Sequence, residues 1–139
     1  MQKIVIDTNV IVSSLIQRNY PNFIIDELFL ENKFQLCISE ELVAEYFEVL
    51  KRPKFSKFQD FFIRAKALLA EIESKATMYQ PKIKLDLISD KDDNMILELA
   101  DECNADFIIT GNNNDFTFPL YKQTKIITPK EYWDNYRPT

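Results

Sequence analysis

Residues 3–13 read Lys-Ile-Val-Ile-Asp-Thr-Asn-Val-Ile-Val-Ser, an apolar strand-like run that stops on an acid, Asp7. A carboxylate at the carboxyl end of the first strand of an α/β chain lies in the crevice where open parallel sheets bind ligands. Thr8 and Asn9 follow directly, and small polar residues there either cap the next helix or hold a neighbouring carboxylate. The stretch therefore predicts either an active-site acid at Asp7 or an N-cap cluster formed by these three residues.

On both sides of this stretch, strand-like and helix-like segments alternate without a linker or a repeat. The expected strands are residues 3–6, 34–38, 105–110 and 125–127, and residues 77–87 are a loop or a short edge strand. The expected helices are residues 8–17, a segment from 21, 39–52, 57–74, a segment capped by Ser89 or Asp90 and ending near 103, and 129–136. Strands separated by helices imply a largely parallel central sheet covered on both faces, in one domain spanning residues 1–139.

The composition excludes several kinds of active site. The chain has no histidine, which excludes triads with a histidine base and histidine-ligated zinc. Its only glycine is Gly111, which excludes a phosphate-binding P-loop and a glycine-rich dinucleotide turn. Cys37 and Cys103 lie outside any C-x-x-C spacing and are expected to be small buried hydrophobes. Carboxylates, amides, hydroxyls, lysines and arginines remain, a set that suits a metal ion held by oxygen ligands.

Charge and hydropathy limit the partners. The net charge of −5 argues against a general electrostatic hold on nucleic acid. Lys51, Arg52 and Lys54 form the most basic short segment, which is either a local contact for phosphates or a solvated helix end. No secretory leader and no apolar run of about eighteen residues is present, so we expect a cytoplasmic protein.

Four acidic places stand at strand or helix ends. Asp7 and the segment 112–115 each follow a predicted strand, and parallel strands bring such ends to one edge of the sheet. Asp92 and Asp93 begin a helix that must pass this edge, and Glu45 borders the apolar face of another helix. Each acid alone has an ordinary explanation, as a solvated side chain or as a first-turn acid that interacts with the helix dipole.

Five segments, in this order and spacing, resemble a PIN-domain ribonuclease over nearly the full length of the chain. They are residues 4–10 (Ile-Val-Ile-Asp-Thr-Asn-Val), Ser39 with 45–54 (Glu-Tyr-Phe-Glu-Val-Leu-Lys-Arg-Pro-Lys), 92–100 (Asp-Asp-Asn-Met-Ile-Leu-Glu-Leu-Ala), 105–112 (Ala-Asp-Phe-Ile-Ile-Thr-Gly-Asn) and 126–132 (Ile-Ile-Thr-Pro-Lys-Glu-Tyr). The resemblance is greatest to bacterial PIN proteins classed as toxins of toxin–antitoxin pairs, relatives of VapC. It implies a three-layer α/β/α PIN-like fold.

The resemblance also implies a set of site residues. The first three acids of the family fall on Asp7, Glu45 and Asp93; periodicity alone does not choose between Asp92 and Asp93. The fourth acid usually follows Thr-Gly directly, where this chain has Asn112. Asp115, three residues further on, is the alternative fourth acid, and Asn112 is an alternative ligand through its carbonyl oxygen. The expected metal ligands are therefore these acids and Asn112, with Thr8, Asn9 and Thr110 orienting the carboxylates.

The implied function is an endoribonuclease that depends on Mg²⁺ or Mn²⁺ and hydrolyses RNA phosphodiester bonds. The implied catalytic acids are Asp7, Glu45, Asp93 and Asp115, with weak RNA contacts at Lys51, Arg52 and Lys54. A cognate antitoxin and a second copy of the chain are the implied partners. The alternative is a PIN module with weakened or lost catalysis that binds RNA or a protein. A phosphoacceptor signalling domain fits less well, because Ile127-Thr128-Pro129 stands where it would need a lysine.

Overall fold

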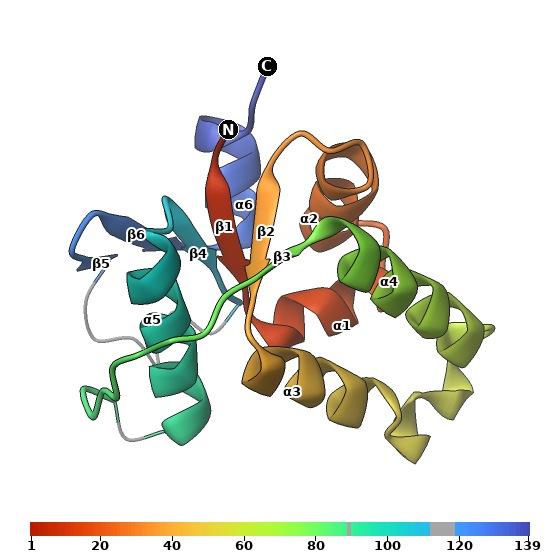
Figure 1. Ribbon diagram of the computed structural model, residues 1–139. Helices are drawn as coiled ribbons and strands as arrows, with labels where there is room; N and C mark the ends of the chain where they lie inside the picture. The colour runs from red at the N-terminus through yellow and green to blue at the C-terminus, as the bar shows by residue number, and fades with distance from the viewer. Residues whose placement is uncertain (89, 112–118) are drawn as a thin grey trace.

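A central, mostly parallel sheet organises the chain (Figure 1). The computed structural model describes residues 1–88, 90–111 and 119–139. Within them the sheet has the strand order β3-β2-β1-β4-β6-β5, and β5, antiparallel to β6, is the exception to its parallel pairing. The strands are β1 (Lys3–Ile6), β2 (Gln35–Ile38), β3 (Thr77–Met78), β4 (Phe107–Ile109), β5 (Leu120–Tyr121) and β6 (Thr124–Ile127).

The register of the central strands places their carboxyl ends at one edge. Ile6 of β1 pairs with Ile109 of β4, which pairs with Ile127 of β6. These three β-branched residues are buried, and each ends a run of two or three apolar residues, as expected for strands covered on both faces. The next residues continue the pairing, since the Asp7 N–H donates to the Ile109 carbonyl at 3.0 Å. Asp7 is therefore fixed at the sheet edge by its own backbone.

Helices connect the strands and begin where the sequence offers a cap. They are α1 (Thr8–Ile16), α2 (Tyr20–Phe23), the π-helical η1 (Ile24–Phe29), α3 (Glu40–Leu50), the 3₁₀ turn η2 (Pro53–Lys57), α4 (Phe61–Lys75), α5 (Lys91–Cys103), α6 (Pro129–Glu131) and the π-helical η4 (Tyr132–Tyr136). The Ser39 hydroxyl accepts the Leu42 N–H at 3.1 Å and starts α3. Thr128 and Glu131 form the capping box that the sequence predicted before α6.

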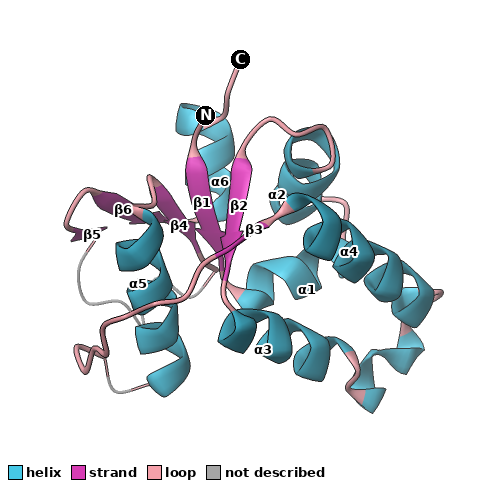
Figure 2. Cartoon of the chain, viewed as in Figure 1, coloured by secondary structure: helices cyan, strands magenta, loops and turns pink. Residues whose placement is uncertain are grey.

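The helices lie on both faces of the sheet, as Figure 2 shows. Helix α5 packs on β1, β2 and β4, and α6 lies behind β1 on the opposite side (Figure 1). Tyr132, which follows α6, is fully buried and meets Phe34 and Phe107 edge to face at 6.3 and 5.5 Å between ring centroids. The three-layer α/β/α arrangement with a largely parallel sheet is thus confirmed.

Two local predictions differ from the structure. The helix expected over residues 57–74 begins later, at Phe61, because Asp60 has a left-handed backbone (φ 58°) and Phe58 an extended one. Strand β5 was not predicted, since two residues carry no recognisable alternation. It turns into β6 through Lys122, which is also left-handed (φ 52°). The edge strand expected within 77–87 is confirmed as the two-residue β3.

Other expectations about the core and the helices are met. Cys37 on β2 and Cys103 at the end of α5 are both buried and free. Asp90 caps α5 by accepting the Asp92 N–H at 2.8 Å, whereas Ser89 lies outside the described residues. In the part of the chain that the structure describes, no helix has both the length and the apolar character of a membrane span.

Candidate active site

Asp7 occupies the N-cap position of α1, yet its side chain makes no capping hydrogen bond. Its Oδ2 instead accepts a hydrogen bond at 2.7 Å from the hydroxyl of Thr110, the residue that follows β4. The Asn9 amide donates to the same oxygen at 3.5 Å, and the Asn9 Oδ1 accepts the Gly111 N–H at 3.2 Å. Of the two interpretations of this motif, the structure therefore favours a carboxylate held in place by its polar neighbours.

Glu45 reaches the same edge of the sheet from α3. The Thr8 hydroxyl, at the start of α1, donates to Glu45 Oε2. The next residue, Tyr46, is fully buried and donates its hydroxyl to the Ile6 carbonyl at 2.5 Å. Tyr46 thereby ties α3 to the end of β1 and fixes the place of Glu45. The sequence signal for this role is a tyrosine within the apolar ridge of α3, since a buried phenol needs an acceptor.

Asp92 and Asp93 approach from the first turn of α5. Asp92 is exposed and lies close enough to Glu45 for its negative charge to act on that carboxyl, whereas Asp93 is only 7% exposed. Periodicity left the choice between these two acids open. The structure places both of them on the same cavity as Asp7 and Glu45.

The surroundings of Glu45 favour its protonated form. Burial, together with the hydrogen bond and negative charge of Asp92 and the charge of Asp7, raises the pKa of Glu45 to about 7. The hydrogen bond from Thr8 acts in the opposite direction but does not cancel the rise. Near neutral pH this side chain is therefore divided between its protonated and charged forms, so a nearby cation would displace a proton.

These acids share a cavity of about 460 Å³ at the carboxyl edge of the sheet, between the starts of α1 and α5 and the side of α3. Its described lining residues are Asp7, Thr8, Asn9, Val12, Ser13, Glu45, Val49, Arg52, Lys54, Phe55, Asp90, Asp92 and Asp93. Asn112 and Asp115, the two alternatives for the fourth position, lie outside the described residues. The cavity thus collects three of the predicted acids and two of the predicted orienting residues.

Comparison with known proteins identifies the family. A model of the PIN domain matches residues 3–114. The chain belongs to the PIN domain family. Over 143 aligned residues this PIN domain is 30% identical to an uncharacterised protein of Methanocaldococcus jannaschii, with 96% of this chain and 91% of that protein covered.

A solved structure shares the fold. The crystal structure of VapBC2 from Rickettsia felis, bound to a DNA fragment from their promoter, matches with a TM-score of 0.58 and 18% identity, covering 91% of this PIN domain and 98% of that chain. PIN domains are nucleases, so membership of the family supports a hydrolase activity for this protein.

The donor set of the cavity fits a hard divalent cation, because every polar group that the acids bring is an oxygen. The negative charges of Asp92 and Asp7 help to raise the pKa of Glu45, and a bound cation would relieve this repulsion. Among the described residues, however, no group of three or more acidic or cysteine side chains is arranged to hold a metal ion. A metal site at this edge would thus need the acids to draw together or a ligand from residues 112–118.

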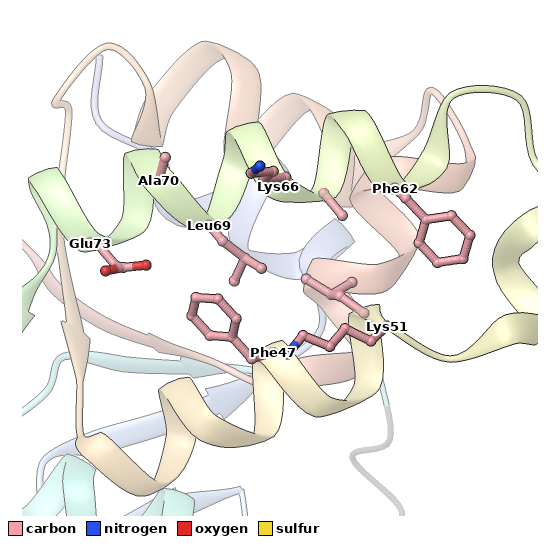
Figure 3. A pocket seen from close by; sticks show the side chains of 9 residues that line it. Phe47, Lys51, Phe62, Lys66, Leu69, Ala70 and Glu73 are labelled. Carbon is pink, nitrogen blue, oxygen red and sulfur yellow. The ribbon is translucent and has the colours of Figure 1, made fainter.

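The three cations predicted to contact RNA separate in the structure. Arg52 and Lys54 line the acidic cavity. Lys51 instead lines an apolar groove of about 410 Å³ between α3 and α4, with its Nζ 5.8 Å from the ring centroid of Phe47. Figure 3 shows Lys51 and Phe47 on one side of this groove and Leu69 on the other.

Proposed function

We propose that this PIN domain is an endoribonuclease that depends on Mg²⁺ or Mn²⁺, and that it acts as the toxin of a toxin–antitoxin pair. The observation that carries the proposal is that the acid after β1 and acids of α3 and α5 line one cavity at the sheet edge, with Asp7 and Glu45 each accepting a threonine hydroxyl. An array of carboxylates is costly to bring together without a cation, so this arrangement has no evident purely structural purpose.

In this proposal Asp7, Glu45 and Asp93 hold the metal, and Asn112 or Asp115 adds a ligand. When bound there, a divalent ion would supply an acidified water and would offset the negative charge of the phosphate. Thr110 and Asn9 keep the Asp7 carboxylate at the cavity wall, and Thr8 does the same for Glu45. Glu45 releases its proton when the cation binds, since burial favours the neutral form in its absence.

The test is cleavage of single-stranded RNA with and without divalent metal, by the native protein and by Asp7→Asn. We expect cleavage that requires the metal and is lost in Asp7→Asn. Asp134→Asn is the matched control, because it makes the same change on an exposed helix-surface ion pair with Lys130. Cutting that survives Asp7→Asn, or that proceeds fully in EDTA, would contradict the proposal.

The second candidate function is a PIN module that binds RNA or a protein without cutting. Asn112, in the place of the fourth acid, is the observation that favours it. The variant Asn112→Asp distinguishes the two functions. A large gain in metal-dependent cleavage would mark the native chain as catalytically depleted, whereas unchanged cleavage would show that the acid is dispensable here.

The partners in this proposal are an antitoxin protein and a second copy of the chain, in the cytoplasm. The similar fold in the VapBC2 structure supports the antitoxin partner through its name alone. The net charge of −5 is compatible with a basic antitoxin segment. Co-expression with the product of the neighbouring reading frame tests the first partner, and light scattering of the purified protein tests the second.

A further inference from the structure

The cationic side chains of the basic segment, residues 51–57, line two different cavities. It runs from the end of α3 through the turn η2, and Lys51 and Lys54 are both exposed. Lys54 lines the acidic cavity and Lys51 the groove between α3 and α4. Two exposed lysines, three residues apart, therefore lie on two different surfaces, the acidic cavity and the apolar groove.

The backbone around Lys54 is fixed by its neighbours. Pro53 starts the turn, and the Phe55 N–H donates to the Arg52 carbonyl at 3.1 Å. The ring of Phe55 is 7% exposed and stacks on Phe61, with centroids 4.7 Å apart. The Lys54 Nζ lies 5.3 Å from the centroid of the Phe55 ring. Lys54 is thus held over an anchored ring at the wall of the cavity.

The two cations on this cavity differ in their pairing. Arg52 donates to the Glu48 carboxylate at 2.9 Å, so part of its charge is already matched. Within the described ranges 1–88, 90–111 and 119–139, Lys54 makes no ion pair with a carboxylate. Lys54 is therefore the cavity cation with more of its charge available to a phosphate.

We propose that Lys54 binds a backbone phosphate of the substrate beside the cleaved bond, so that the strand enters the acidic cavity across η2. The inference rests on the proposed nuclease function and adds the path of the substrate. A nucleic acid strand brings several negative phosphates to a wall of carboxylates, and a cation on that wall offsets their repulsion. A contact between a lysine and a backbone phosphate carries no direct sequence information, so we expect no base preference from Lys54.

The test measures the salt dependence of binding in the Asp7→Asn background, which prevents cleavage. The probes are labelled oligouridylate and oligoadenylate of equal length, in the presence of Mg²⁺. We expect Lys54→Ala to lower the slope of log K against log salt by about 0.7, the value for one phosphate contact on a single strand. We expect Lys51→Ala, which removes the same charge from the groove, to leave this slope unchanged. We expect Lys54→Arg, which keeps the charge, to have the same slope as the protein with Lys54.

Each other outcome overturns a defined part of the account. Equal changes of slope in Lys54→Ala and Lys51→Ala would show a general charge effect and overturn the role of Lys54. A loss confined to one of the two oligonucleotides would overturn the backbone contact. An unchanged slope in Lys54→Ala, with cleavage by the native protein still dependent on Asp7, would overturn this inference alone. No binding and no cleavage of either oligonucleotide would overturn the proposed function as well.

Discussion

Replacing Glu45 by glutamine removes a carboxyl group whose pKa the fold raises from 4.5 to about 7. Between these two pH values the folded protein binds this proton more tightly than the unfolded chain does. The stabilising contribution of the protonated Glu45 is therefore fully present below about pH 4.5 and is lost as the pH rises through about 7. Glutamine is nearly isosteric, does not titrate, and still offers an oxygen to the Thr8 hydroxyl.

The size of the effect follows from the change in pKa. A difference of this extent corresponds to about 3 kcal/mol for a group fully shielded from solvent. Glu45 is only half-buried, and solvent screening reduces the expected value to about 1–2 kcal/mol. In EDTA, the free energy of unfolding of the native protein should therefore fall relative to that of Glu45→Gln by about 1–2 kcal/mol between pH 4.5 and pH 7.

The assay is urea-induced unfolding of both proteins at several pH values, in which the difference between the two proteins removes the titration of all other groups. A matched control is Glu41→Gln, an exposed acid on the same helix. A difference between the native protein and Glu45→Gln that is flat with pH, or that rises with pH, would refute the reasoning. Added Mg²⁺ should reverse the trend, because a cation binds the deprotonated form and stabilises it more as the pH rises.

Three further predictions concern residues around the cavity. Thr110→Val removes the hydroxyl that donates to Asp7 and should lower the free energy of unfolding by about 1–2 kcal/mol. It should also weaken metal binding, as measured by unfolding with and without Mn²⁺. An unchanged stabilisation by Mn²⁺ would contradict the role of Thr110 in orienting Asp7. Tyr46→Phe removes the hydrogen bond to the Ile6 carbonyl and should lower the free energy of unfolding in urea by about 1 kcal/mol. It should also reduce RNA cleavage. Full cleavage activity would show that the position of Glu45 does not depend on this hydrogen bond. Asp92→Asn removes a negative charge beside Glu45 and should lower the pKa of Glu45. In this background, the pH-dependent change in unfolding free energy that Glu45→Gln abolishes should occur at a lower pH. An unchanged pH would contradict a contribution of Asp92 to the pKa of Glu45.

The sheet edge was predictable from the sequence because its signals are local. Residues 4–6 and 107–109 are apolar, as expected for buried parallel strands, and a polar residue follows each run directly. Their parallel pairing brings Asp7 and Thr110 together, as the α/β alternation implied. The place of Asp7 at the site thus follows from pattern and topology.

The other site residues depend on tertiary contacts that no local pattern contains. Glu45 borders an apolar ridge like many solvated helix acids, and its place follows from the contact of Tyr46 with the end of β1. Glu45 on α3 and Asp92 on α5 line the same cavity, and no sequence signal shows that these two helices are close to each other. Lys51 and Lys54 are close in the sequence but line different cavities, because Lys51 caps the end of α3 whereas Lys54 lies in the turn η2 that Pro53 begins.

The local errors have a similar cause. Asp60 takes a left-handed backbone that asparagine or glycine would have signalled more clearly, so the late start of α4 was not evident. Strand β5 is defined by its pairing with β6 rather than by its two residues. In both places a neighbouring element decides the backbone conformation.

The central claim, that the acids on this cavity bind a divalent metal, is tested most directly by thermal unfolding in EDTA, in Mg²⁺ and in Mn²⁺. A cation that binds the folded state alone stabilises it by about 2.7 kcal/mol at about 100 times its Kd. We predict a metal-dependent rise in Tm for the native protein and for Asp134→Asn, and none for Asp7→Asn. An equal rise in all three proteins, or no rise in any of them, would contradict the claim.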